Sequence, residues 1–205
     1  SRQIVLLTIA LMLIINPFVA YLMQWNQALV LPEFLESIQI WMEASEQKAM
    51  QLTEAFLQMQ TSSDLVVNLF LIALIPAIGE ELLFRGVLQQ FLAKWTGKIH
   101  LAIFISGFLF SAIHLQFFGF LPRLILGVVL GYMFYWSKNL WLPILAHFTN
   151  NALAVIFSYQ LVAQKVQVDL LNEEIPVNFS AALISFFAAA LLMYLLHKKT
   201  SIKKG

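Results

Sequence analysis

The sequence predicts an all-α fold, a polytopic bundle of about six transmembrane helices with an amphipathic helix outside the membrane between the first two spans. Two features of the composition support this class. Hydrophobic residues make up 60% of the 205 residues and charged residues only 11%, and the mean hydropathy is +0.81. A soluble domain carries about a quarter charged residues. At roughly 20 residues per span, the chain has room for about six helices and little else, so we treat residues 1–205 as a single membrane-embedded domain.

Six apolar runs mark the expected spans, of which the third and fourth are short. They lie near Ile4–Met23, Leu65–Leu92, Leu101–His114, Leu121–Trp136, Leu140–Tyr159 and Phe179–Leu196. Sustained apolar runs of this kind identify transmembrane helices. Within the second run, Pro76 and Gly79 predict a kink, because proline removes a backbone hydrogen bond and glycine adds backbone freedom.

Residues 33–60 form a different kind of segment. Apolar residues recur there at helical spacing against acidic and amide residues, which indicates an amphipathic helix. Its polar face is acidic rather than basic, so we expect it to pack on protein or project into solvent instead of lying on a lipid surface. Two roles suit such a helix: recruitment of a substrate or partner subunit, and a structural cap.

The distribution of charge predicts the topology. The acidic residues outside the second span all fall between spans one and two or between spans five and six. The alternate ends carry lysine or arginine and no acid, at Arg2, Lys94, Lys98, Lys138, Lys198, Lys199, Lys203 and Lys204. The positive-inside rule therefore places both ends of the chain in the cytoplasm, and we expect a multi-pass protein of the plasma (inner) membrane. Because the chain starts with Ser1 rather than Met, we also expect it to be a processed or truncated form of the native protein.

Composition excludes several classes of function. The chain has no cysteine, which rules out disulfides, thiol nucleophiles and thiolate metal sites. A net charge of +1 offers no basic face, so no nucleic-acid partner is expected. The length leaves no room for a soluble catalytic domain beside the spans, so any chemistry must take place inside the bundle.

The second span carries the charges that most need explaining. An ionised carboxylate at the bilayer centre costs roughly 2.5–3.5 kcal/mol on insertion scales, so it requires a partner or a function. Glu81 and Arg85 are four residues apart and share one face of a helix, which predicts a structural ion pair. Glu80 is turned about 100° away from Glu81, so it is free to meet another helix.

Polar residues in two other spans are candidates to meet Glu80. His114 ends the third span, and His147 shares a helical face with Asn151 in the fifth. Taken alone, His114 is explained as a satisfied core histidine, and the buried amides of the fifth span as groups that hold helices together. Counting residues from the cytoplasmic end of each span gives the depth of these side chains in the membrane. The depths of Glu80, His114 and His147 are close enough for the three to converge. One glutamate, two histidines and an asparagine gathered in a low-dielectric bundle favour a functional site.

Such a set of side chains can activate water. A carboxylate can act as general base, and a neighbouring imidazole can share or relay the proton. His147 and Asn151 can donate hydrogen bonds to the oxyanion that forms when water attacks a peptide carbonyl. Zinc is the alternative, because Glu80, His114 and His147 are ligands of the kind found in catalytic zinc sites, although the sequence contains no HExxH motif.

Three short patterns resemble motifs of the CPBP (CAAX protease and bacteriocin-processing, Abi) family of intramembrane proteases, which is related to type II CAAX prenyl endopeptidases. Residues 80–85 read EELLFR and are similar to EExxxR, residues 110–114 read FSAIH and are similar to FxxxH, and residues 147–151 read HFTNN and are similar to HxxxN. They occur in the family's order. The resemblance covers a catalytic-like core of about residues 64–159 and leaves out the first span, the amphipathic helix and the last span.

The resemblance implies an intramembrane endopeptidase that acts on a membrane-associated peptide or protein in the lipid bilayer. It would give Glu80 the role of general base for water, with His114 assisting, Glu81 and Arg85 supporting the site, and His147 and Asn151 forming the oxyanion hole. Both a metalloprotease mechanism and a metal-free glutamate mechanism have been argued for this family, so a zinc cofactor and no cofactor both fit. A prenylated substrate is not implied by anything in the chain.

Two other functions remain open at this stage. A family member that keeps the polar core but does not cleave would act as a scaffold, an immunity factor or a subunit of a membrane complex. A small proton-coupled transporter would also use intramembrane carboxylates and histidines, but the sequence shows no inverted repeat. In the fourth span, Gly127 and Gly131 form a GxxxG element that predicts close helix packing, and Arg123 is expected to anchor the outer interface rather than to hold a substrate.

Overall fold

The computed structural model describes residues 1–163 and 177–201, and within these ranges every regular element is a helix. Each of the six apolar runs lies in or largely overlaps a helix. They correspond to α1 (Arg2–Gln27), an irregular helix over Ser62–Thr96, α6 (Ile99–Ala112), α7 (Phe120–Ser137), α8 (Trp141–Ala163) and α9 (Phe179–Ser201). The all-α helical bundle predicted from the sequence is thereby confirmed.

The helices differ in how well each would cross a membrane alone. In the described part of the chain, four helices are long and apolar enough to cross a membrane: Arg2–Gln27, Ser62–Thr96, Phe117–Ser137 and Phe179–Ser201. The helix α6 has 14 residues, which at 1.5 Å per residue is about 21 Å and less than the roughly 30 Å of a hydrocarbon core. The helix α8 has 23 residues, but the polar stretch from His147 to Asn151 lies within it.

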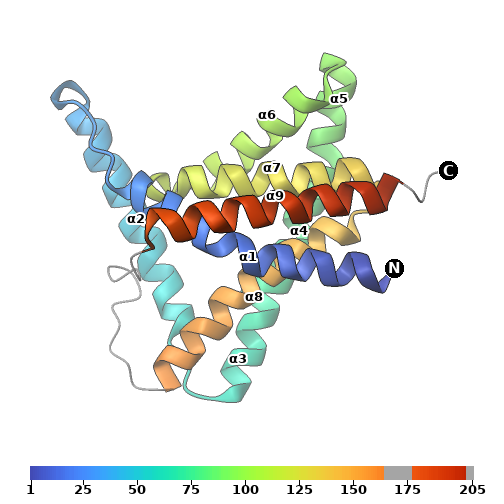
Figure 1. Ribbon diagram of the computed structural model, residues 1–205. Helices are drawn as coiled ribbons and strands as arrows, with labels where there is room; N and C mark the ends of the chain where they lie inside the picture. Colours follow the sequence, from blue (N-terminus) through green and yellow to red (C-terminus); the bar gives the residue numbers. More distant parts are fainter. Residues whose placement is uncertain (164–176, 202–205) are drawn as a thin grey trace.

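Three helices run along the length of the bundle. Figure 1 shows α1 and α9 side by side beside α7, with the start of α1 and the end of α9 at the same end. Their buried residues meet α8 in one apolar cluster that includes Leu11, Met12, Met133 and Ala146. Because Ala146 precedes His147, this cluster fixes the rotation of α8 and thereby the direction of the polar face that follows it.

The helix over Ser62–Thr96 is irregular on both sides of Glu80. It consists of α3 (Ser62–Asn68), a π-helical segment η2 (Leu69–Leu74), α4 (Ile75–Glu81), a second π-helical segment η3 (Leu82–Leu88) and α5 (Gln89–Thr96). Two π segments that the sequence did not indicate thus flank the segment with Pro76, and the kink expected there stays a prediction. Pro76 lies at the start of α4, directly after the first π segment, and it offers no backbone N–H to that preceding turn. π-Helical turns occur frequently at functional sites.

The expected amphipathic helix is present as a short turn η1 (Glu33–Leu35) followed by α2 (Glu36–Leu57). It lies at the end of the bundle opposite the start of α1 (Figure 1), and none of its residues is buried. It contacts the short 3₁₀ segment η4 (Phe117–Gly119) that leads into α7. The Trp41 and Phe117 rings lie 5.0 Å apart, and the backbone N–H of Phe118 donates to Glu46 Oε2 at 3.3 Å. The helix thus packs on protein, as its acidic face suggested.

Candidate active site

Glu80 lies near the end of α4, where it faces two histidines from other parts of the chain. Its Oε2 is 4.0 Å from Nε2 of His114 and 3.8 Å from Nε2 of His147. Among the described residues Oε2 has no direct hydrogen-bond partner. Separations of this size are ones that a bridging water can span. The structure therefore brings together the three side chains whose convergence the sequence made plausible.

The hydrogen bonds of the two rings define which nitrogens face Glu80. Nδ1 of His114 lies 2.7 Å from the carbonyl oxygen of Phe110, and a carbonyl can only accept, so this nitrogen carries the proton. Nδ1 of His147 lies 2.9 Å from Oε1 of Glu81, and a carboxylate likewise accepts. In the neutral form of each ring, Nε2 is then an acceptor directed at Glu80. Two imidazole nitrogens and a carboxylate oxygen thus converge as hydrogen-bond acceptors.

Glu81 and Arg85 form the ion pair that their spacing predicted. Nη1 of Arg85 donates to Oε1 of Glu81 at 2.7 Å, and both side chains are fully buried. Nη2 of Arg85 donates to the carbonyl oxygen of Gly127 at 2.8 Å, which links this helix to α7. The guanidinium also lies over the ring of Phe110, 4.9 Å from its centroid. The pair thus has partners on α6, α7 and α8, of which the partner on α8 is His147. Oε1 of Glu81 accepts from both Arg85 and His147.

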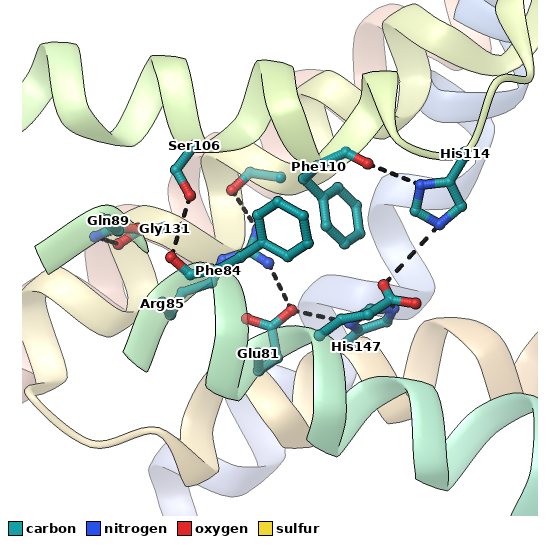
Figure 2. A network of polar contacts seen from close by, with 11 residues as sticks. Glu81, Phe84, Arg85, Gln89, Ser106, Phe110, His114, Gly131 and His147 are labelled. Carbon is teal, nitrogen blue, oxygen red and sulfur yellow. Dashed lines mark hydrogen bonds and ion pairs between the residues drawn. The ribbon is translucent and has the colours of Figure 1, made fainter. Parts of the chain in front are cut away.

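Phe110 has a central place in the site that the sequence analysis did not assign to it. Its ring is 5.2 Å from the ring of His114 and 5.7 Å from that of His147, with edge-on geometry in both cases. On its other side it meets Phe84 edge-on at 5.2 Å. Figure 2 shows this ring between the Phe84–Arg85 side of the network and His114. It supplies an apolar wall that sets the orientation of both imidazoles.

The GxxxG element of α7 has the packing role expected of it. A Cβ atom on Gly127 would come within 3.0 Å of the Cα of Gly107 in α6, so the two helices meet backbone to backbone. Close approach also makes the carbonyls of α7 accessible: Gly127 accepts from Arg85 as described, and Gly131 accepts from Nε2 of Gln89 at 3.1 Å. Small residues therefore give the buried charge of Arg85 a partner on a second helix.

A cavity of about 270 Å³ lies beside Glu80. Its wall is formed by Met12, Ile72, Pro76, Glu80, Phe110, His114, Arg123, Leu126, Leu130, His147, Asn150 and Asn151. Asn151 donates from Nδ2 to the carbonyl of Ile72 at 3.4 Å, and Nδ2 of Asn150 lies 3.4 Å from Oδ1 of Asn151. Both contacts are long for hydrogen bonds, so each amide is held only weakly by its present partner. All three predicted motifs contribute side chains to this one cavity.

Arg123 differs from its expected place. Instead of anchoring the outer interface, its side chain lines the cavity and donates from Nη1 to the carbonyl oxygen of Gln116 at 3.1 Å. Its Nη2 donates to the side-chain oxygen of the same residue. The direction of a side chain at the end of a helix depends on the preceding loop, which helical periodicity does not describe.

The residues beside the cavity allow a test of the zinc hypothesis. Each histidine has Nδ1 held by an oxygen and Nε2 free, which is the arrangement that orients metal-bound imidazoles. Ligand atoms that share a tetrahedral zinc ion at about 2.0–2.1 Å lie roughly 3.4 Å apart, whereas Glu80 Oε2 is 3.8 and 4.0 Å from the two nitrogens. Within residues 1–163 and 177–201 no group of three His, Cys, Asp or Glu residues could hold a metal ion. The donors suit zinc in kind, but their spacing does not fit it.

Comparison with known proteins agrees with the motifs. Residues 62–153 match the family model described as "Rce1-like: Type II CAAX prenyl endopeptidase Rce1-like". Over 114 residues the chain is 29% identical to a protein of Bacillus subtilis (strain 168) named "Uncharacterized protein YpbD". The alignment covers 54% of this chain and 54% of that protein, so the chain spans about half the length of the curated relative it matches. No solved structure matches the chain.

The matched range begins at the start of α3 and ends in α8, so it contains Glu80, His114, His147 and Asn151 together with the Glu81–Arg85 pair. It supports a membrane endopeptidase of the CAAX-protease type at the level of the family. The individual roles of these residues remain predictions. Through the core at residues 62–153, the chain is thus similar to the Rce1-like type II CAAX prenyl endopeptidases, in agreement with the resemblance of its three motifs to the CPBP family.

Proposed function

We propose that this protein is an intramembrane endopeptidase in which Glu80 activates a water molecule that hydrolyses a peptide bond of a membrane-associated substrate. The observation that carries the proposal is the convergence of Glu80 Oε2 with Nε2 of His114 and of His147 at 4.0 and 3.8 Å, beside a cavity. A water between Glu80 Oε2 and Nε2 of His114 has an acceptor for each of its protons. Its oxygen lone pairs are then free to face a carbonyl carbon in the cavity.

The first step would transfer one proton from this water to Glu80 while the oxygen attacks the carbonyl carbon. His114 supports the step because its Nε2 accepts the second hydrogen of the water, and Phe110 holds the ring from Nδ1. A tetrahedral intermediate with a negatively charged oxygen forms. Glu80 then gives its proton to the leaving nitrogen as the carbon–nitrogen bond breaks, so the reaction consumes one water and leaves Glu80 ionised again.

His147 and Asn151 are proposed to stabilise the oxyanion of that intermediate. In its imidazolium form, His147 donates from Nε2 toward the cavity while Glu81 still accepts from Nδ1. Asn151 has an amide whose bond to Ile72 is long, so this donor can turn to the oxyanion at small cost. Glu81 and Arg85 act through His147 and do not touch the substrate, since both are fully buried.

The proposal is tested with purified protein in lipid nanodiscs and a library of membrane peptides analysed by mass spectrometry. Glu80→Gln should reduce cleavage by about a hundredfold or more, the scale of a general-base contribution. Lys94→Gln removes an exposed charge outside the cavity and should cleave like the wild type. The folded state should survive Glu80→Gln, because Oε2 makes no direct hydrogen bond within the described residues.

A chelator arm addresses the metal alternative. Because the three donors are too widely spaced for zinc, cleavage should persist when a chelator is added. Loss of cleavage in chelator, with recovery on addition of zinc, would assign the reaction to a metal site instead. Cleavage by Glu80→Gln at the wild-type rate contradicts the glutamate mechanism, and no cleavage by any protein in any condition favours a scaffold role.

We further propose that the protein lies in the plasma (inner) membrane with both ends of the chain in the cytoplasm. In support, the start of α1 and the end of α9 lie together (Figure 1), and basic residues gather at the ends of the spans on that side. Since the chain has no cysteine, single-cysteine variants give a clean labelling test. Lys98→Cys should be protected from an impermeant thiol reagent in intact cells, whereas Ser45→Cys in α2 should be labelled, and the reverse pattern would invert the topology.

A further inference from the structure

Arg123 is a cation in the wall of the cavity that the proposed reaction does not use. It belongs to the first turn of α7, whereas Glu80 reaches the same cavity from α4. Its side chain is partly buried. Arg85, the neighbouring buried arginine, is not among the residues of the wall and is already bonded to Glu81 and Gly127.

The partners of Arg123 are neutral. Nη1 and Nη2 donate to the carbonyl and the side-chain oxygen of Gln116, and in the described part of the chain none of the ion pairs includes Arg123. Glu46 and Glu80 are the carboxylates whose charges act on it, yet neither comes within ion-pair distance. A guanidinium removed from bulk water without a direct counter-ion is costly, and an incoming anion relieves that cost.

The loop before α7 holds the guanidinium in place. Leu115, between His114 and Gln116, has a left-handed backbone conformation, with φ of 53°. Gly119 leaves room for the arginine, since a Cβ atom there would come within 2.7 Å of Nη1 and displace the guanidinium. The same loop therefore positions His114, the helper of the proposed base, and the acceptors that hold Arg123.

The chemistry of the group and the size of the cavity indicate what it binds. A planar guanidinium matches a carboxylate in a bidentate manner, and this pairing is among the stronger hydrogen-bonded contacts in proteins. The cavity of about 270 Å³ is at the small end of ligand pockets, so a group that reaches Arg123 must lie close to the bond held at Glu80.

We propose that Arg123 is a specificity-determining residue that binds a carboxylate of the substrate a short distance from the scissile peptide bond. The inference rests on the proposed function, because it assigns the substrate chemistry of the same cavity. Two parts of a peptide can supply the carboxylate: the free C-terminus and an acidic side chain. Arg123 would hold either one while the neighbouring carbonyl faces Glu80.

The test measures binding rather than cleavage. Glu80→Gln protein in nanodiscs is incubated with short hydrophobic peptides, each synthesised with a C-terminal carboxylate, with a C-terminal amide, or as the amide with an internal glutamate. Retained peptides are quantified by mass spectrometry. Carboxylate-bearing forms should be retained roughly tenfold or more over the plain amide, the scale of a charge-assisted contact. The form that shows the gain identifies the source of the carboxylate.

Three additional variants in the Glu80→Gln background make the result specific to Arg123. Arg123→Gln should abolish the preference for a carboxylate. Gly119→Ala keeps the positive charge but displaces the guanidinium, so it should weaken the preference even if Arg123→Gln folds poorly. Lys94→Gln removes a positive charge that is exposed and outside the cavity wall, and it should leave the preference unchanged.

The outcomes separate this inference from the proposed function. Equal retention of all peptide forms, no retention of any form, or a preference that survives Arg123→Gln overturns the role of Arg123, even if the wild type cleaves peptides. A preference that depends on Arg123, in a protein whose wild type cleaves nothing, supports the carboxylate site and contradicts the protease. The protease function and the carboxylate site are both supported only if cleavage depends on Glu80 and the preferential retention of carboxylate peptides depends on Arg123.

Discussion

Nδ1 of His147 lies 2.9 Å from Oε1 of Glu81, and the contact is buried. The same carboxylate oxygen accepts from Arg85 at 2.7 Å, and Arg85 in turn donates to the carbonyl of Gly127. One buried oxygen thus joins α4, α8 and, through the guanidinium, α7. The ion pair that stabilises the bundle and the histidine that faces Glu80 belong to a single hydrogen-bonded network, so changes to the pair should affect both folding and the site.

Replacing Arg85 with alanine should strongly destabilise the bundle. The substitution leaves the fully buried Glu81 carboxylate without its ion-pair partner, and loss of one member of such a pair costs about 3–5 kcal/mol. The thermal unfolding midpoint of the purified protein in detergent reports the loss. Lys94→Ala, which removes an exposed charge, is the matched control and should change the midpoint little. Equal midpoints for the two variants would contradict the structural role of the pair.

Two substitutions of His147 should distinguish the role of its Nδ1, which contacts Glu81, from that of its Nε2, which faces Glu80. Asparagine places an amide near the position of Nδ1 and can still donate to Glu81, whereas glutamine reaches toward the position of Nε2 and loses that bond. Both variants should lose cleavage, but His147→Gln should also be less stable by about 1–3 kcal/mol, because Glu81 loses a donor. Cleavage assays and unfolding midpoints measured on the same preparations make the comparison. A glutamine variant more stable than the asparagine variant would argue against this geometry.

Glycines in two helices should respond oppositely to alanine. Gly127→Ala pushes a methyl group to 3.0 Å from the Cα of Gly107, so α6 and α7 must separate, at a cost of about 1–3 kcal/mol. Gly79→Ala meets no atom within 4 Å and should stabilise the folded state by roughly 0.4–1 kcal/mol, since it restricts the unfolded chain. Unfolding midpoints measured side by side test the pair, and a neutral Gly127→Ala would mean that the close approach of the two helices is dispensable.

The contact of α2 with the loop at Phe118 should depend on pH through Glu46. Partial burial raises the pKa of this carboxyl above its ordinary value of 4.5, although the N–H of Phe118 and the charge of Arg123 oppose the shift. Between 4.5 and the raised pKa the folded state binds more protons than the unfolded state. The free energy of unfolding should therefore fall as pH rises through this window and level off above it.

Glu46→Gln provides the measurement for this effect. The amide does not titrate, but its oxygen can still accept the N–H of Phe118. The difference in unfolding midpoint between the wild type and Glu46→Gln should change with pH in the window just above 4.5, with the wild type losing stability relative to the variant as pH rises. A difference that stays constant across that range would show that Glu46 titrates alike in both states.

Much of the fold could be predicted from local patterns. Apolar runs located each of the six helices, and an amphipathic repeat located α2. The Glu81–Arg85 pair follows from a spacing of four residues within one helix, and it is present at 2.7 Å. These features succeed because hydropathy and helical periodicity are properties of neighbouring residues, which the sequence records directly. The functional roles of the site residues are not tested by such patterns and remain predictions.

Other features required the packed structure. The π segments on either side of α4 have no local signal in the sequence, and they change the direction in which Glu80 and Arg85 point. Likewise, the partners of the two histidines come from a backbone carbonyl and a carboxylate that only the assembled helices bring into place. Arg123 lines the cavity, where Gln116 accepts from its guanidinium and Gly119 leaves room for it.

By itself the sequence determined that this chain is an all-α membrane protein with an intramembrane ion pair and three polar motifs in the order of a protease family. Tertiary structure alone decided that Nε2 of both histidines faces Glu80, that Phe110 packs edge-on against both rings, and that a cation lines the same cavity. The physical reason is one of range. Helix formation and burial depend on residues a few positions apart, whereas these contacts depend on how separate helices rotate and approach when they pack.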